Sequence, residues 1–250
     1  MPEERVEGMS REARRRQRRL GLFIALLVTV AVLSVLLHGQ ILDDIFSPLV
    51  RGAIYRVETE RKAVALTFDV VWMPAETGVL LDILDRYQVR VTFFLTGQWV
   101  RNNPDLAREI ILRGHEIGQH SFSHQRLPEL GDKELASEFD LLEKALREEL
   151  NVTTKLFRPP YGDLDQRVQD FAAERGYTTV LWSINPHDWL NPGVDLIARR
   201  VLQNIHQGAI VLFHSSSSQL PEALPLIIEG LRAKEYEMLT VSALLGLAGK

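Results

Sequence analysis

From Lys62 onward the chain alternates between two kinds of segment, and this alternation limits the fold more than any other feature. Apolar residues at helical spacing, such as Leu135, Phe139 and Leu142, mark one kind. The other kind is short, rich in β-branched and aromatic residues, and typical of strands. Such runs lie at 63–69, 90–96, 116–120, 156–159, 178–184, 209–214 and 237–241. Strands separated by helices predict a parallel α/β domain, and the pattern is compatible with both a barrel and an open doubly wound sheet.

Composition excludes several classes of protein. The absence of cysteine from all 250 residues excludes a disulfide scaffold, a thiolate zinc site and a cysteine nucleophile. With 46% hydrophobic and 25% charged residues, the chain is neither disordered nor a polytopic membrane protein. The net charge of −4 divides into +3 over residues 1–19 and −7 over the remainder. Because the body is mildly acidic, we expect no nucleic-acid partner.

A long apolar segment precedes this domain. Leu20 to Leu37 is a run of 18 uncharged residues. As a helix it would measure about 27 Å, close to the ~30 Å thickness of the hydrocarbon core of a bilayer. Six arginines lie just before it, within residues 11–19. Since positive charge favours the cytoplasmic side, the pattern predicts a transmembrane helix with its N-terminus in the cytoplasm.

The alternative for this segment is a cleaved signal peptide. Signal peptides have a shorter apolar region and small residues at the cleavage site, whereas residues 34–40 read SVLLHGQ. We therefore expect an uncleaved anchor and a single-pass protein of the cell membrane with its large domain outside the cytoplasm. The predicted parts are a cytoplasmic basic segment 1–19, a transmembrane anchor 20–37, a tether 38–61 and an exported domain 62–246.

Unusual polar and aromatic residues gather where the predicted strands end. Taken singly, each has an ordinary explanation, such as a helix cap, a surface histidine or a structural ion pair. Jointly, they share the carboxyl edge of the strands, where parallel α/β proteins place their sites. That shared location predicts one functional site. The residues are Asp69, His120, His124, Arg158, Tyr161, Asp188, Trp189, Leu212 and His214.

The motifs around these residues resemble those of a known family. TFD, HSFSH, RPPYG, DW and LFH, in this order, are similar to the five motifs of the NodB-type polysaccharide deacetylases, which form carbohydrate esterase family four. The resemblance extends from Lys62 to Leu244. It implies a distorted (β/α) barrel of about seven parallel strands. It also implies a hydrolase that uses a divalent metal to remove acetyl groups from polymers that contain N-acetylglucosamine.

The resemblance assigns a role to each residue of the hydrolytic centre. His120 and His124 match metal ligands, for zinc or a similar transition metal that activates a water molecule. Asp69 matches the general base, and Arg158 matches the residue that keeps this carboxylate ionised and oriented.

The remaining residues match the groups that handle the leaving amine and the acetyl group. His214 matches the general acid, with Asp188 raising its pKa and fixing its orientation. The backbone N–H of Tyr161 matches an oxyanion donor, while Trp189 and Leu212 match the lining of the acetyl pocket.

One position departs from the family pattern. The family has a second aspartate, a metal ligand, directly after the base, and this chain has Val70. Since valine ligates nothing, we expect the metal to bind with reduced affinity. A TFD followed by an apolar residue, together with RNNP, PHDWLNPG and the anchor, resembles the sporulation-type, membrane-anchored branch of the family.

Three functions therefore stay open. We expect first an N-deacetylase that acts on peptidoglycan or a related polysaccharide. The alternatives are a degenerate domain that binds glycan without turnover and an O-acetyl esterase on the same fold.

Overall fold

The computed structural model describes residues 50–249 except Met73. The predicted basic segment, the predicted anchor at 20–37 and the first half of the tether, 38–49, lie outside the described residues. Between Val50 and Gly249, no helix has both the length and the apolar character needed to cross a membrane.

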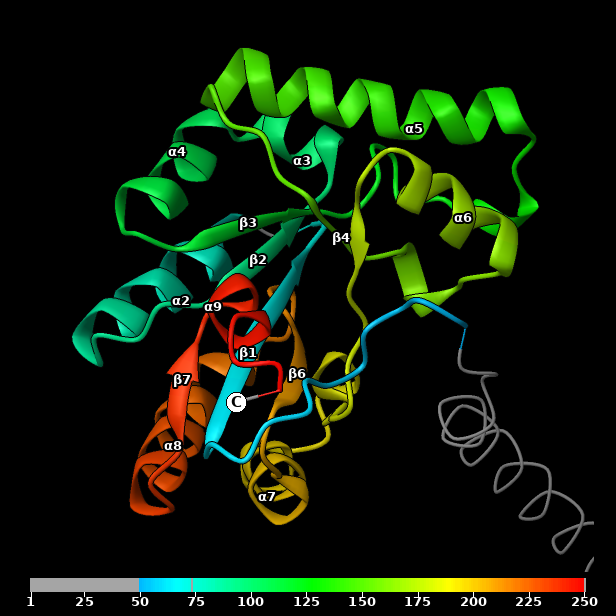
Figure 1. The fold of residues 1–250 in the computed structure, drawn as a ribbon. Coiled ribbons are helices and arrows are strands. Elements are labelled where there is room, and N and C mark those ends of the chain that lie inside the picture. The colour runs from blue at the N-terminus through cyan, green and yellow to red at the C-terminus, as the bar shows by residue number, and fades with distance from the viewer. Residues whose placement is uncertain (1–49, 73, 250) are drawn as a thin grey trace, which may run out of the picture. The chain divides into compact units, whose positions relative to one another are not determined.

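A curled, wholly parallel sheet forms the centre of the domain (Figure 1). Its strands are β1 (Ala63–Val70), β2 (Thr92–Leu95), β3 (Glu116–Gln119), β4 (Leu156–Phe157), β5 (Thr178–Thr179), β6 (Ala209–His214) and β7 (Glu237–Leu239). Their order is β5-β4-β3-β2-β1-β6, with β7 also paired to β1. All seven predicted strands are confirmed, and the curled sheet is the half-barrel form of the expected barrel.

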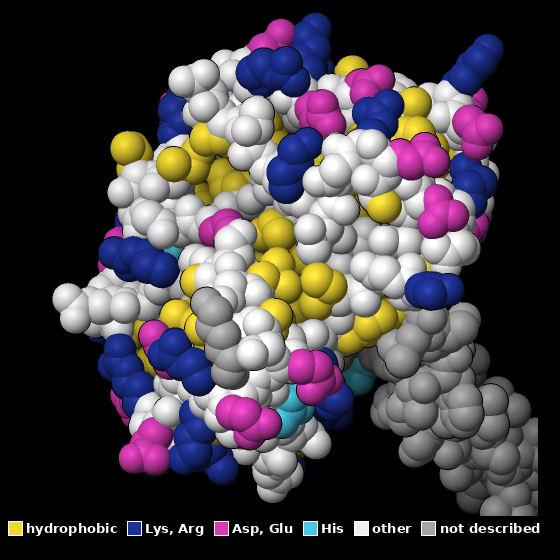
Figure 2. Space-filling model, viewed as in Figure 1, with side chains coloured by type: hydrophobic (Ala, Val, Ile, Leu, Met, Phe, Trp, Pro, Cys, Tyr) yellow, Lys and Arg dark blue, Asp and Glu magenta, His cyan; other side chains and the backbone are white. Residues whose placement is uncertain are grey.

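Helices surround the sheet, as the predicted alternation requires. They are α2 (Pro74–Arg86), α3 (Gly97–Asn102), α4 (Pro104–Leu112), α5 (Asp132–Ala145), α6 (Gln166–Glu174), α7 (Val194–Asn204), α8 (Leu220–Ala233) and α9 (Val241–Leu245). Short helical turns η1 (Leu127–Glu129), η2 (Leu146–Leu150), η3 (Pro160–Gly162) and η4 (Asp188–Leu190) complete the set. On the face drawn in Figure 2, charged side chains of both signs are interspersed, with apolar side chains exposed between them.

The chain before β1 ties the two edges of the curled sheet together. Ile54 bridges Val180 in parallel, and Arg56 pairs antiparallel with Ala209 of β6. The Val57 N–H also donates to the Gly208 carbonyl at 2.9 Å. These residues fall in the predicted tether, yet they belong to one compact unit with the sheet, which begins at Val50. The compact unit that contains the sheet therefore includes these residues, which pair with both edges of the sheet.

Strand β1 carries both the core and the site on its two faces. All eight of its residues are buried, as expected for a strand covered on both sides. Val64, Leu66, Phe68 and Val70 alternate along the strand and belong to the largest apolar cluster. The Phe68 ring packs against those of Phe93 and Phe213, with centroids 5.1 and 5.3 Å apart. Burial of each such side chain stabilises the fold by about 1.5–3 kcal/mol.

The same alternation separates Val70 from Asp69. Successive side chains of a strand point to opposite faces, so Asp69 and Thr67 lie on the concave face of the sheet. Thr67 Oγ1 donates to the Val211 carbonyl at 2.6 Å there. Val70 lies on the helix-covered face instead, fully buried among apolar side chains.

Candidate functional site

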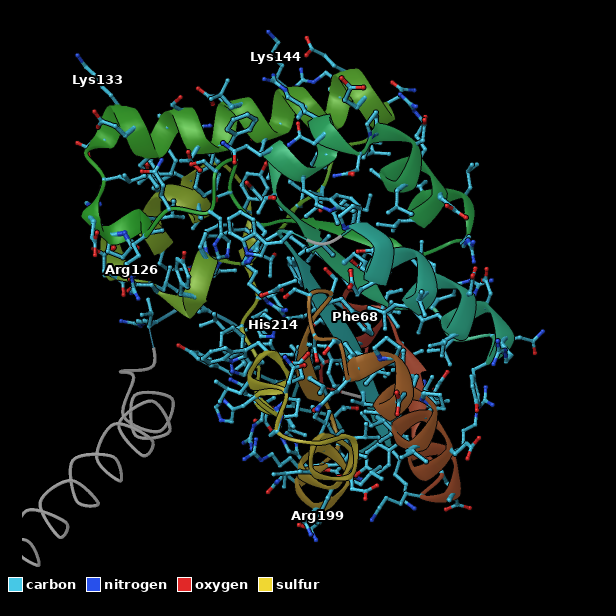
Figure 3. All side chains as sticks on the ribbon, turned by 180° about the vertical axis from the view of Figure 1, so that it is seen from behind. Phe68, Arg126, Lys133, Lys144, Arg199 and His214 are labelled. Atoms are coloured by element: carbon cyan, nitrogen blue, oxygen red, sulfur yellow. The ribbon has the colours of Figure 1, made fainter. Side chains whose placement is uncertain are left out.

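Strand pairing brings the predicted base and the predicted acid together. Asp69 and His214 are register partners at the carboxyl ends of β1 and β6. Partner residues on adjacent parallel strands point to the same face, so the two side chains lie next to each other. Figure 3 shows His214 near the middle of the molecule, whereas Lys133 and Lys144 extend outward from α5.

A fully buried arginine holds Asp69 in place. Arg158 follows β4, and its Nη1 donates to Asp69 Oδ1 at 2.8 Å. Its other donors reach the carbonyls of Val180 and Leu181 at 3.1 and 3.0 Å. Burial alone would raise the pKa of Asp69, but the electrostatic interactions with His120 and Arg158 and the hydrogen bond from Arg158 outweigh burial and hold that pKa below its usual value. The carboxylate is therefore ionised at neutral pH, as a general base must be.

A second buried carboxylate holds His214. Asp188 in η4 accepts hydrogen bonds from His214 Nδ1 at 2.9 Å and from the His214 backbone N–H at 2.8 Å. Burial lowers the pKa of His214, but the hydrogen bond and the charge of Asp188 more than compensate and raise the pKa above its usual value. Protonation of His214 is thereby favoured, which is the state that a general acid needs.

The two predicted metal ligands lie beside this centre. His120 is 1% exposed, and its Nδ1 lies 2.8 Å from the Arg158 carbonyl. Its Nε2 lies 3.5 Å from Asp69 Oδ2. The rings of His120 and His124 are 4.9 Å apart, and His124 Nδ1 is buried without a hydrogen bond to any described residue. Burial lowers the pKa of both rings, to about 3 for His124, so both are neutral at pH 7.

Neutral imidazoles fit a divalent transition metal, but the site has one protein ligand fewer than such a metal needs. Zinc sites in hydrolases hold the metal with three protein ligands and leave one position open. The third ligand expected by resemblance is replaced by Val70, whose side chain faces the apolar core rather than the histidines. Between Val50 and Gly249, no three His, Asp or Glu side chains converge as a metal site. The residues therefore fit a metal through His120 and His124, with a third ligand missing.

A glutamate that sequence reasoning missed holds the loop between the two histidines. Glu138 of α5 is buried, and its Oε2 accepts the backbone N–H groups of Phe122 and Ser123 at 2.9 and 2.8 Å. Its Oε1 accepts from Ser123 Oγ at 2.6 Å. The available signal was a charged residue on the apolar face of a helix, between Leu135 and Leu142. Because these bonds lie between the histidines in sequence, Glu138 fixes how the loop presents His124.

Exposed aromatic rings border the site on three loops. Trp72 after β1 is 62% exposed and meets the His124 ring edge-on at 6.3 Å. Tyr161 after β4 is 57% exposed, lies 4.5 Å from the same ring and has a left-handed backbone with φ of +61°. Trp189 is half-exposed in η4. Leu212 is buried on the same face of β6 as His214, which suits the predicted floor of a small apolar pocket.

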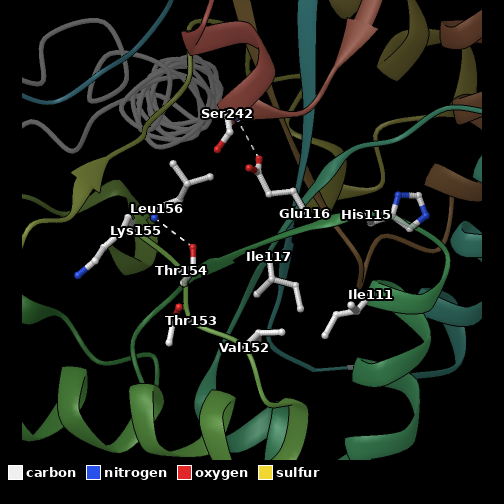
Figure 4. Close-up of a pocket in the computed structure, with 10 residues that line it drawn as sticks. All are labelled: Ile111, His115, Glu116, Ile117, Val152, Thr153, Thr154, Lys155, Leu156 and Ser242. Atoms are coloured by element: carbon white, nitrogen blue, oxygen red, sulfur yellow. Dashed lines mark hydrogen bonds between the residues drawn. The ribbon is translucent and has the colours of Figure 1, made fainter.

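A separate cavity of about 290 Å³ lies where β3 begins (Figure 4). Its walls include Glu116, Val152, Leu156 and Ser242. None of the predicted site residues lines it, because they follow the opposite, carboxyl ends of the strands. His115 at its margin is a buried imidazole outside the site, and burial lowers its pKa to about 4.

Comparison with known proteins agrees with the motifs. A family model described as polysaccharide deacetylase matches residues 56–180. The chain is 38% identical over 200 residues to the peptidoglycan-N-acetylglucosamine deacetylase of Bacillus cereus, covering 76% of this chain and 92% of that protein. It is 35% identical over 192 residues to the uncharacterized protein YlxY of Bacillus subtilis, covering 77% of this chain and 60% of YlxY. The chain thus spans less than two thirds of YlxY.

Solved structures give the same fold. The Bc1960 peptidoglycan N-acetylglucosamine deacetylase superposes with a TM-score of 0.76 at 28% identity, covering 80% of this chain and 95% of that one. BA3943, described as a CE4 family pseudoenzyme from Bacillus anthracis, superposes with a TM-score of 0.75 at 32% identity, covering 79% of this chain and 70% of that one. A mutant of BA3943 is described as having restored enzymatic activity. These matches agree with the Arg158–Asp69 pair, the Asp188–His214 pair and the two adjacent histidines of the site. They show that the chain belongs to the polysaccharide deacetylase family of hydrolases, carbohydrate esterase family four.

Proposed function

We propose that this protein removes N-acetyl groups from a glycan outside the cytoplasm, with peptidoglycan or a related N-acetylglucosamine polymer as its substrate. The observation that carries the proposal is the pair of buried carboxylates on opposite sides of one centre. Arg158 favours the ionised form of Asp69, while Asp188 favours the protonated form of His214. Neighbouring groups with opposite protonation preferences are the arrangement that acid–base hydrolysis needs.

Each residue then has a defined part in amide hydrolysis. Asp69 removes a proton from a water molecule as its oxygen bonds to the acetyl carbonyl carbon. The backbone N–H of Tyr161 donates to the oxyanion of the tetrahedral intermediate. His214 gives its proton to the amide nitrogen as the carbon–nitrogen bond breaks, which releases acetate and the free amine. A divalent cation held by His120 and His124 would supply Lewis-acid polarisation of the carbonyl.

The exposed rings suit a sugar polymer. Trp72, Tyr161 and Trp189 stand on separate loops around the acid–base centre. Flat aromatic side chains give the large, rigid contact area on which the apolar faces of sugar rings can pack. We assign these rings to the sugars on either side of the reacting unit.

A test of the proposed activity measures acetate released from N-acetylglucosamine oligomers and from peptidoglycan by the purified full chain. We expect release that stops on chelation and that His214→Asn reduces by about 10²–10⁴-fold. Release that is unchanged in His214→Asn would contradict the assigned acid. Release from O-acetylated glycans alone would identify an esterase instead.

A second candidate is a domain that binds glycan without hydrolysis. The position of Val70 in the apolar core favours it, because the third metal ligand is missing. The similarity to BA3943, described as a pseudoenzyme, supports the same view. This function predicts saturable binding of peptidoglycan fragments by calorimetry with no acetate released at any metal concentration.

We also propose that residues 20–37 anchor the protein in the cell membrane and that the chain belongs to the sporulation-type branch of the family. The uncharged run and the arginines before it support the anchor, and the RNNP and PHDWLNPG segments support the branch. In cells that express the full chain, alkaline carbonate should leave it in the membrane fraction, and protease added outside should digest the domain. Release by carbonate would contradict the anchor. Transcripts confined to spore formation in a spore-forming host would support the branch, and transcripts throughout growth would contradict it.

A further inference from the structure

A guanidinium lies over one of the aromatic rings that border the site. The Cζ atom of Arg126 is 4.9 Å from the centroid of the Tyr161 ring. The same ring lies 4.5 Å from that of His124. Figure 3 shows Arg126 nearer the outline of the molecule than His214. The mechanism proposed above gives Arg126 no part, although it contacts the same ring as a residue of the hydrolytic centre.

The loop that carries Arg126 is fixed on both sides of this residue. The next residue, Leu127, is completely buried. Arg167 of α6 donates to three backbone carbonyls within residues 127–130, at 2.9 to 3.3 Å. Arg126 also reaches the loop after β4, because its Nη1 donates to Asp163 Oδ2 at 2.8 Å. The guanidinium is therefore placed before any ligand arrives, which lowers the entropy cost of binding.

The ion pair with Asp163 uses only part of the guanidinium. An arginine carries five N–H donors in a planar fork, and Asp163 accepts from Nη1. No other group of the described residues forms a hydrogen bond with this guanidinium, and the Arg126 side chain is 52% exposed. Its Nε and Nη2 therefore present an open edge, with the geometry that binds a carboxylate through two parallel hydrogen bonds.

We propose that Arg126 binds a carboxylate of the glycan, so that the site selects an acidic N-acetylated polymer over a neutral one. The inference rests on the proposed function and names the class of glycan. A sugar that packs on the exposed Tyr161 ring comes within reach of the guanidinium over that ring. A carboxylate on this sugar or on its neighbour then accepts from Nε and Nη2. Because Asp163 and Glu129 offset part of the charge, the contact provides selectivity more than affinity.

Binding of two tetrasaccharides by the purified full chain tests this proposal. One alternates N-acetylglucosamine with N-acetylmuramic acid and carries free lactyl carboxylates, and the other is the neutral tetramer of N-acetylglucosamine. Titration calorimetry with a chelator present measures both affinities without turnover. The wild type should prefer the acidic tetramer, and Arg126→Gln should lower that preference by about fivefold, as expected for an ion pair at a partly exposed position. An unchanged preference in Arg126→Gln would overturn the proposal.

Arg175 provides a matched control outside the site. It also lies over an aromatic ring, 4.6 Å from the centroid of Phe171, and it also forms an ion pair, with Asp140. It follows α6 and precedes the amino end of β5, whereas Arg126 follows the carboxyl end of β3. Arg175→Gln should therefore keep the preference of the wild type. An equal loss of preference in both variants would overturn the specific role of Arg126.

Salt provides a test that needs no substitution. Contacts between partly exposed charges are screened, so the preference of the wild type should shrink when NaCl is raised from about 0.05 M to about 0.5 M. A preference that does not change with salt, or no preference at all, would overturn the proposal. If neither tetramer binds and no acetate is released, the proposed function fails together with this inference. If acetate is released equally from acidic and neutral glycans, only this inference fails.

Discussion

Two halves of the site are built differently. The acid–base half consists of Asp69 and His214 with their partners, and the imidazole half consists of His120 and His124. Asp69 and His214 lie on paired strands, and each has a buried partner of complementary charge at 2.8 or 2.9 Å. In the imidazole half, His124 lies on a loop, and its Nδ1 has no hydrogen-bond partner among the described residues. The carboxylate that the family supplies there is replaced by Val70. Strand register thus fixes the groups to which we assign proton transfer, whereas the proposed cation binding depends on a loop and on one altered position.

The largest effect expected from this difference is on stability. Val70→Asp should lower the free energy of unfolding by about 3–5 kcal/mol, because it buries an unpaired charge in the helix-covered core. Chemical denaturation measures this, and Val70→Thr, similar in shape and uncharged, should cost less. A stable Val70→Asp protein that binds Zn²⁺ more tightly would show that position 70 can reach the histidines. The distinction between the two faces of β1 would then be lost.

In the acid–base half, Asp188→Asn should lower kcat by about 100-fold. In the proposed mechanism activity requires protonated His214, so the rate should fall as pH rises through the pKa of His214, which Asp188 raises. Without that charge the pKa falls, and the alkaline limb of the pH–rate profile should move to lower pH. Acetate release measured across pH checks this, with Arg199→Gln at an exposed position of α7 as a control. An unmoved alkaline limb would mean that Asp188 does not act through His214.

The Zn²⁺ affinity of the imidazole half should depend on how the loop before His124 is held. Glu138→Gln should weaken Zn²⁺ binding by about tenfold, because an amide cannot accept all three hydrogen bonds from the loop. Glu134→Gln removes the same charge from an exposed position of the same helix and should leave the affinity unchanged. Titration calorimetry compares the two variants. Equal affinities would show that the loop presents His124 without Glu138.

The smallest expected effect concerns the aromatic border. Trp72→Ala should raise KM for glycan oligomers about threefold to tenfold and leave kcat nearly unchanged, since the exposed ring touches substrate rather than the reacting atoms. Leu112→Ala, at an 85% exposed position on α4, is the control. A fall in kcat with constant KM would show instead that Trp72 positions His124, whose ring it contacts.

The sequence predicted most of the sheet because local patterns carry that information. The seven apolar runs became the seven strands, and the motifs at their ends met at one edge because parallel strands share a direction. What the sequence did not predict depends on contacts between distant segments. Ile54 pairs with Val180, and Glu138 reaches back to Phe122, with no local signal for either pairing. The membrane anchor at 20–37 lies outside the described residues and stays a prediction.

Motif reading also misses the direction of a side chain. Asp69 and Val70 are neighbours in sequence, and the resemblance treats both positions as parts of one site. The pleat of β1 sends them to opposite faces, one toward His120 and the other into the core. Strand phase therefore decides which of two adjacent residues is available to a ligand.

The bridges made by Ile54 and Arg56 have a mechanical consequence. This short segment joins β5 and β6 as a seam, so a pull on the chain from its N-terminal side loads the backbone hydrogen bonds that close the sheet. A chain trimmed to begin at Lys62 would lose these bonds and keep the direct bridge between Ile184 and Val211 of β6. The stretch that leads into the domain therefore reinforces the closure of the sheet.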